Sequence, residues 1–207
     1  MRKQTLAVCL MAGLALSAGC KKNAVDQSAF QSAINNYLSA RQQCVWSAPI
    51  KLPAQATTSD EDQTKGFDAL TDAGLLTRKS AEKKRFLVGS KQVNDYDLSD
   101  QGRSKWTADT SQPGYGNFCY GHPQVTSIDS YTPQTSDSAN YTVAYHYDVS
   151  SLPDWANSAE MKTAFPGLAT ATSPQPGTAN LTKSNSGWVV ESATPGSNAA
   201  TDTSPTQ

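Results

Sequence analysis

Aliphatic residues, long apolar runs and an excess of one charge are all scarce in this chain of 207 residues. After position 19, Leu, Ile, Val and Phe number 27 of 188 residues, a low share for a well-packed core. The same stretch holds 15 basic and 18 acidic residues, so it lacks the high net charge that accompanies disorder. No apolar run reaches the roughly 20 residues needed to span a bilayer. These shortages exclude a protein with membrane-spanning helices, a coiled coil, a collagen-like rod and a polybasic nucleic-acid binder.

Aromatic side chains supply much of the apolar material that remains. The chain has five Phe, four Trp and eight Tyr, and all of them follow position 19. Aromatic rings bury large areas and pack in specific geometries, so they can build a core where aliphatic residues are few. The sequence therefore predicts a folded domain with an aromatic-weighted core.

The first twenty residues carry the clearest motif in the chain. Arg2 and Lys3 precede a thirteen-residue apolar run over residues 6–18, which is too short to span a bilayer and is typical of an export signal. The run ends in Leu16-Ser17-Ala18-Gly19-Cys20. This ending resembles the lipobox of bacterial lipoprotein signals, in which small residues precede a cysteine. Ser17 stands where that family usually has Leu.

The resemblance covers residues 1–22 and implies that Cys20 is lipidated. Diacylglycerol would be attached to the Cys20 thiol, residues 1–19 would be removed, and the new amino group would be acylated, with palmitate as a typical chain. Two or three chains anchor a protein stably, because each buried methylene contributes about 0.8 kcal/mol. In Gram-negative members a residue other than Asp after the cysteine accompanies outer-membrane sorting, so Lys21 favours the periplasmic leaflet of that membrane. The alternative is an ordinary secretory signal in which Cys20 has no special role.

Export determines what the remaining cysteines are expected to do. Cys9 leaves with the signal, so Cys44 and Cys119 are the two thiols left beside Cys20. Two such thiols outside the cytoplasm are expected to form a disulfide. The alternative makes Cys119 a nucleophile with His122 nearby, but a reactive thiol in an oxidising compartment tends to be lost to oxidation.

The fold class expected for the mature chain is α+β, as a single domain over residues 26–191. Residues 20–25 are expected to form a lipidated tether. Residues 26–110 hold N-terminal helices with a small winged-helix-like segment, and residues 111–191 form an antiparallel sheet with one short helix. Residues 192–207 have no large apolar side chain and are expected to be a disordered tail.

Two helices and a strand pair are expected in the first half. Apolar residues at helical spacing predict a helix over residues 26–42. Ser59 before three acidic residues predicts the capped start of a second helix, which closes at Gly74. Strands are expected over residues 85–88 and 92–98, joined by a turn.

Part of this half resembles the winged-helix fold. The segments Leu70-Thr71-Asp72-Ala73-Gly74-Leu75-Leu76 and Tyr96-Asp97-Leu98-Ser99-Asp100-Gln101-Gly102 are similar to the last helix and wing of bacterial winged-helix domains. The resemblance covers residues 59–106 and implies an architecture, not a function. No nucleic acid is expected as a partner, because an exported domain meets no chromosome and a mature charge of −3 does not attract phosphate.

The second half predicts antiparallel strands. Residues 141–149 alternate apolar or aromatic residues with polar ones, so one face should be buried and His146 should face solvent. A short helix is expected from Pro153 to Phe165, ended by Pro166-Gly167. A hairpin is expected around the turn sequence Asn185-Ser186-Gly187.

The sequence offers no catalytic or metal-binding motif, and no cofactor is expected. A phosphate-binding loop, a Gly-x-Ser-x-Gly turn and zinc-binding His or Cys patterns are all missing. A metal site on His122 and His146 would need scattered carboxylates. Asp95, Asp97 and Asp100 approach calcium-loop spacing without its glycine and closing glutamate, so they are expected at a strand end and a helix cap. A glycosidase-like carboxylate pair remains open, because such pairs converge in space and not in sequence.

Two segments are candidates for binding. Six cations fall within fourteen residues: Arg78, Lys79, Lys83, Lys84, Arg85 and Lys91. They could dock to anionic lipid or acidic glycan, or simply keep a strand edge solvated. A second segment groups aromatic residues and a histidine among three glycines: Tyr115, Phe118, Tyr120 and His122. These residues could face a sugar or peptide, or pack around the disulfide.

These features predict a membrane-anchored envelope lipoprotein that acts as a non-enzymatic binding or accessory module. The expected partners are membrane lipid, through acylated Cys20, and an envelope protein or glycan. One alternative is an envelope hydrolase acting on cell-wall or glycan material. The other is an inhibitor or immunity-type lipoprotein, which a protruding loop would favour.

Overall fold

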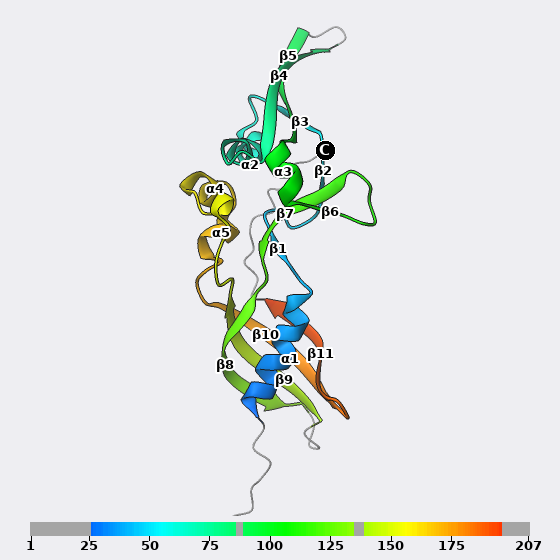
Figure 1. The fold of residues 1–207 in the computed structure, drawn as a ribbon, viewed down its shortest axis with the longest axis vertical. Helices are drawn as coiled ribbons and strands as arrows, with labels where there is room; N and C mark the ends of the chain where they lie inside the picture. The colour runs from blue at the N-terminus through cyan, green and yellow to red at the C-terminus, as the bar shows by residue number, and fades with distance from the viewer. Residues whose placement is uncertain (1–25, 86–88, 135–138, 196–207) are drawn as a thin grey trace, which may run out of the picture.

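The computed structural model describes residues 26–85, 89–134 and 139–195 and shows an α+β protein, so the expected fold class is confirmed. The signal, Cys20 and the tether lie outside the described residues. The strands form three antiparallel sheets. Figure 1 shows an elongated molecule, with one sheet and the first helix at one end and a projecting hairpin at the other.

A four-stranded sheet with the order β11-β10-β9-β8 forms one end of the molecule. Its strands are β8 (Gln124–Pro133), β9 (Asn140–Asp148), β10 (Gln175–Ser184) and β11 (Gly187–Pro195). Alternate residues of β9 are buried, which confirms the predicted pattern and leaves His146 on the outer face. The predicted hairpin also forms, with Ser184 paired to Gly187 at its turn. Its second strand continues to Pro195, so residues 192–195 pair with β10 and are not part of the disordered tail predicted over residues 192–207.

Helix α1 (Gln27–Ser39) packs on the inner face of this sheet (Figure 1). The Asp26 carboxylate caps the helix by accepting a hydrogen bond from the backbone N–H of Ser28. Phe30, Ile34 and Leu38 are four residues apart, so they share one helix face, and all three are buried. The ring of Phe30 contacts the rings of Tyr131, Tyr141 and Trp188. The first helix and the last hairpin therefore share one aromatic core.

The opposite end contains a three-stranded sheet, in the order β3-β5-β4, packed against helix α2 (Glu61–Asp72). The strands are β3 (Ala54–Thr57), β4 (Leu76–Arg85) and β5 (Gly89–Leu98). Asp60 caps α2 by accepting a hydrogen bond from the backbone N–H of Gln63, one position later than the cap predicted at Ser59. Gly74 has φ +74°, the left-handed conformation predicted to close the helix.

Strand β4 corrects the strand predicted over residues 85–88. Its pairing with β5 runs without interruption from Leu76 opposite Leu98 to Arg85 opposite Gly89, so the basic stretch is itself a strand. Residues 86–88 lie outside the described residues. The sequence pattern suggested a loop because charged side chains dominate it. An edge strand tolerates such side chains, since one of its sides pairs with no other strand.

A third sheet lies between the two ends and is built on β7 (Tyr115–Gly121). Three short strands pair with it: β1 (Gln43–Cys44), β2 (Ile50–Lys51) and β6 (Trp106–Ala108). Helix α3 (Asp100–Lys105) leads into β6. It approaches the turn after α2 so closely that a Cβ at Gly102 would lie 1.8 Å from the carbonyl oxygen of Leu75. Glycine is therefore required at this contact.

Three short helical segments stand between β9 and β10, where the sequence predicts one. They are η1 (Asp154–Ala156), α4 (Ala159–Ala164) and α5 (Pro166–Thr170). Pro166 begins a segment here instead of ending one. Proline suits the first position of a helix, because its φ is already helical and no N–H partner is needed there.

The buried side chains form two cores. One lies between α1 and the four-stranded sheet, and the other gathers residues from α2, β5, β7 and the helical segments before β10. The chain crosses between these cores four times, after α1, β7, β9 and α5. Neither core is therefore formed by a contiguous stretch of sequence.

Candidate functional site

Cys44 of β1 and Cys119 of β7 face each other in the central sheet and form a disulfide. The S–S distance is 2.05 Å, and the two residues are 75 positions apart. The bridge joins the segment that leaves α1 to the strand that leads back into the four-stranded sheet. Because the Cys119 sulfur is in the bridge, it is not the free nucleophile of the alternative interpretation. His122 instead lies 3.5 Å from the side-chain amide of Gln42.

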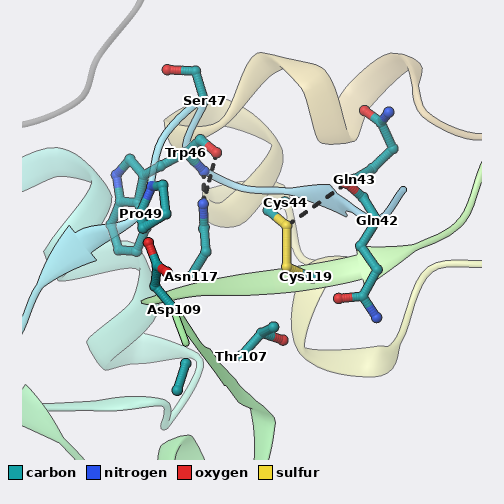
Figure 2. Close-up of a pocket in the computed structure, with 11 residues that line it drawn as sticks. Gln42, Gln43, Cys44, Trp46, Ser47, Pro49, Thr107, Asp109, Asn117 and Cys119 are labelled. Carbon is teal, nitrogen blue, oxygen red and sulfur yellow. Dashed lines mark hydrogen bonds between the residues drawn. A yellow bond between two sulfur atoms is a disulfide. The ribbon is translucent and has the colours of Figure 1, made fainter. Parts of the chain in front are cut away.

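An open groove of about 550 Å³ lies beside the disulfide (Figure 2). The lining comes from β1, β6, β7 and residues that flank β1 and β6: Gln42, Gln43, Cys44, Trp46, Ser47, Pro49, Thr107, Ala108, Asp109, Asn117 and Cys119. Hydrogen bonds from Ser111 lower the pKa of Asp109, so this carboxylate is ionised at neutral pH. Asp109 is the one acidic or basic side chain among these lining residues. The groove thus offers hydrogen-bonding groups and a single negative charge, without an acid–base pair.

Asn117 is a buried polar residue that fixes the wall of this groove. Its Oδ1 accepts hydrogen bonds from the backbone N–H groups of Trp46 (3.3 Å) and Phe118 (3.0 Å). Its Nδ2 donates to the carbonyl oxygens of Trp46 (2.8 Å) and Ala48 (3.4 Å). These bonds hold the segment after β1 against β7 where regular strand pairing is interrupted. A buried amide normally finds partners in this way.

The aromatic residues of β7 serve mainly as core. Phe118 is fully buried and Tyr120 is 8 % exposed, both within the larger core. Burial raises the pKa of Tyr120 to about 12, because ionisation would place a charge in an apolar environment. Tyr115 is half-buried at the start of the strand. Of the two interpretations of this segment, packing near the disulfide is the one that the structure supports.

The histidine and aspartate candidates for metal binding have other partners. The Nδ1 atom of His146 is 2.7 Å from Oδ2 of Asp129 on the outer face of the four-stranded sheet, and this bond lowers the pKa of Asp129. Asp95 and Asp97 belong to β5, and Asp100 is the first residue of α3. Within residues 26–85, 89–134 and 139–195, no three or more His, Cys, Asp or Glu side chains converge as metal ligands would.

The basic stretch lies on the hairpin of β4 and β5, which projects at the end of the molecule opposite α1 (Figure 1). Lys79 and Lys83 of β4 are exposed, and Lys91 of β5 is directly opposite Lys83. Alternate residues of a strand share a face, as do cross-strand partners, so these three lysines lie on one face. We call it the lysine face. The side chains of Lys84 and Arg85 are outside the described part of the structure.

Arg78 belongs to a polar network on the other face of the hairpin. Oδ1 of Asp68 on α2 accepts hydrogen bonds from the Arg78 guanidinium and the Tyr96 hydroxyl, both at 2.7 Å. Asn94 donates to the Tyr96 hydroxyl at 3.3 Å, and Ser80 donates to Asn94 at 3.0 Å. Burial, reinforced by the bond to Asp68, raises the pKa of Tyr96 to about 12. The network connects α2 to the hairpin and places the lysine face on the side away from α2.

A second groove, of about 400 Å³, lies at the base of the lysine face. Its lining residues are Pro53, Ala54, Gln55, Thr77, Lys79, Asp95, Tyr96 and Asp97. Nε2 of Gln55 donates to Oδ1 of Asp95 at 2.7 Å, and its Oε1 accepts from Nζ of Lys83 at 3.2 Å. The groove therefore sets carboxylates and an amide beside the lysines.

Sequence reasoning missed Asn117 and the network around Asp68. A usable signal for Asn117 is its position inside an aromatic strand, directly before Phe118, where a polar side chain must find buried partners. Asp68 stands next to Phe67 on the apolar side of α2, but its partners come from β4 and β5. No local pattern identifies such partners.

Comparison of the chain with protein-family models, with curated proteins and with solved structures finds no match. Among the described residues, no helix is long and apolar enough to cross a bilayer.

Proposed function

We propose that this chain is an exported bacterial lipoprotein, anchored by acylated Cys20, whose domain is a non-enzymatic binding or accessory module of the envelope. The observation that carries the proposal is the disulfide between Cys44 and Cys119. These are the two cysteines that remain once residues 1–19 are removed and Cys20 is acylated. Disulfides persist in oxidising compartments outside the cytoplasm. In a Gram-negative cell, the residue after Cys20 favours the periplasmic leaflet of the outer membrane.

A binding role is supported by the way the domain uses its polar side chains. His146 is bonded to Asp129, and Asn117 is bonded to backbone groups. The Asp68 carboxylate accepts two hydrogen bonds within the network. By contrast, Lys79 and Lys83 are exposed on the projecting hairpin, where Lys83 donates only to the surface side chain of Gln55 among the described residues, so another molecule can reach them.

A winged-helix-like arrangement over residues 59–106 is the architectural part of the proposal. It is supported by the sheet order β3-β5-β4, with α2 placed between β3 and β4 in sequence. In this interpretation the β4–β5 hairpin takes the place of the wing. The likeness concerns architecture, and DNA binding is not part of the proposal.

An inhibitor or immunity-type lipoprotein is the second candidate function. The observation that favours it is the same projecting hairpin, because a protruding segment can insert into a partner's site (Figure 1). Capture of one protein partner by cross-linking in the native cells, lost when the hairpin is altered, would favour this candidate over a glycan-binding module.

Lipidation is tested by metabolic labelling with an alkyne analogue of palmitate. The wild-type chain should incorporate label and fractionate with membranes. Cys20→Ser should incorporate none, because the acylated sulfur is gone. The matched control is Cys9→Ser, which removes a signal cysteine and should leave both labelling and fractionation unchanged. Label that persists in Cys20→Ser would contradict the proposal, as would a wild-type chain without label.

A further inference from the structure

We propose that the lysine face of the β4–β5 hairpin binds a carboxylate-bearing glycan of the cell wall. Lys79 and Lys83 stand four residues apart on β4, so their attachment points are about 13 Å apart along the strand. Lys91 lies across from Lys83 on β5. Three ammonium groups spread along an extended arm can pair with successive carboxylates of an extended polymer.

The groove at the base of the same face favours a glycan over a lipid surface. Gln55, Thr77, Asp95 and Asp97 offer amide, hydroxyl and carboxylate groups, which hydrogen-bond to sugar hydroxyls and acetamido groups. The two aspartates disfavour any anion at this base, so it suits the neutral hydroxyl and acetamido groups of a sugar better than the closely spaced phosphates of an anionic bilayer. A polymer that carries both hydroxyls and separated carboxylates matches both parts of the face.

The position of the hairpin points to the same partner, and this step rests on the proposed anchoring at Cys20. The described chain begins with Asp26, the cap of α1, and α1 lies at the end of the molecule opposite the hairpin (Figure 1). Residues 20–25 span at most about 20 Å when fully extended. In an anchored molecule whose N-terminal end lies at the membrane, the lysine face is therefore at the far end and faces the cell wall.

The test uses the lipidated protein in vesicles of neutral phosphatidylcholine. Flotation of the protein with these vesicles checks the anchor separately, so failure of anchoring is seen before any glycan is added. Purified cell-wall sacculi are then the probe, and the measured quantity is the fraction of vesicles that sediments with them. Vesicles containing one-third phosphatidylglycerol replace sacculi in the second arm, where clustering of vesicles would report lipid binding. If the protein does not float, sacculus binding is measured on the protein in detergent solution.

The decisive variant reverses three charges: Lys79→Glu, Lys83→Glu and Lys91→Glu. It should bind sacculi about tenfold less than the wild type, because three exposed ion pairs become repulsive. The control, Lys51→Glu with Lys105→Glu and Lys183→Glu, makes the same change in net charge at exposed sites elsewhere and should stay within about twofold of the wild type. The milder set Lys79→Gln, Lys83→Gln and Lys91→Gln should give an intermediate loss of sacculus binding. Because it only removes the three charges, this set still tests the proposal if the charge-reversed variant does not fold.

Three results would overturn the proposal. The first is a wild-type protein that does not bind sacculi. The second is an equal loss in the hairpin and control variants, which would mean that net charge alone matters. The third is clustering of phosphatidylglycerol vesicles that is as strong as sacculus binding, which would make lipid the partner. Binding should also weaken as sodium chloride is raised, because exposed ion pairs are screened by salt.

Discussion

Two buried tyrosines differ in the hydrogen bonding of their hydroxyl groups, and this difference affects stability. Tyr96 and Tyr145 are both fully buried. The Tyr96 hydroxyl donates to Asp68 and accepts from Asn94, whereas the Tyr145 hydroxyl has no hydrogen-bond partner within the described part of the chain. Gly177 lies against the ring of Tyr145, where a Cβ would be 2.6 Å from Cζ. A buried polar group without a partner costs about 1–3 kcal/mol of stability.

Replacing each tyrosine by phenylalanine should change the free energy of unfolding differently at the two positions. Tyr145→Phe removes an unpaired hydroxyl, so the free energy of unfolding should stay the same or rise by about 1 kcal/mol. Tyr96→Phe leaves Asp68 and Asn94 each short of a partner, so it should lower the free energy of unfolding by about 1–3 kcal/mol. Urea unfolding of the two variants beside the wild type gives both values. A loss in Tyr145→Phe as large as that in Tyr96→Phe would show that the Tyr145 hydroxyl has a partner.

For single residues, the sequence predicts the environments that follow from alternation along a strand or from the number of available thiols. Alternation placed His146 on the outer face, and the expectation that two thiols remain after export paired Cys44 with Cys119. Asn117 could not be assigned, because three of its four hydrogen bonds join it to backbone groups about 70 positions away. Such partners depend on which segments meet in the fold.

At the scale of the elements, the disulfide that joins β1 to β7 is expected to contribute strongly to the free energy of unfolding. It closes a loop of 75 positions between two strands at a crossing between the cores. In the chain-entropy model such a bridge stabilises the fold by roughly 4 kcal/mol. Cys44→Ser with Cys119→Ser should therefore lower the free energy of unfolding by about that amount, measured by urea unfolding. An effect below about 1 kcal/mol would contradict the predicted role of the bridge.

A thiol count on the wild-type protein checks that the disulfide is present in the molecule with which the double variant is compared. The mature wild-type chain, unfolded without reductant, should show no reactive thiol, and after reduction it should show two. A third thiol after reduction would belong to an unacylated Cys20.

The elements themselves were predictable where the pattern is strong and local. The α1 helix, β9 and the β10–β11 hairpin follow from periodicity and turn sequence. β4 was missed because its lysines and arginines carry no apolar alternation, and its pairing with β5 is what makes it a strand. The segment after Phe165 was missed because proline can either end a helix or begin one, and the sequence does not distinguish these cases.

At the scale of the whole molecule, buried tyrosines make stability sensitive to alkaline pH. Burial raises the pKa of Tyr96, Tyr120 and Tyr145 to about 12, whereas an exposed tyrosine titrates near 10. Above pH 10 the unfolded chain releases protons that the folded chain retains, so the unfolded state is favoured. This contribution to stability is complete below pH 10 and is lost as the pH rises toward 12.

Urea midpoints measured at pH 9, 10.5 and 11.5 should therefore fall progressively. Tyrosinate absorbance of the folded protein should show a group of tyrosines that ionises only near pH 12. A midpoint that does not change over this range, or tyrosines that all titrate near pH 10, would contradict the prediction.

The packing of α1 against the β10–β11 hairpin limits the order in which the chain can fold. Residues 27–39 are synthesised well before residues 175–193, yet Phe30 needs Trp188 beside it in the finished core. Until this hairpin is present, β8 and β9 can cover only part of the apolar face of α1. The aromatic core can therefore close only after nearly all of the described chain is available to fold, and until then the uncovered part of the α1 face is prone to aggregation.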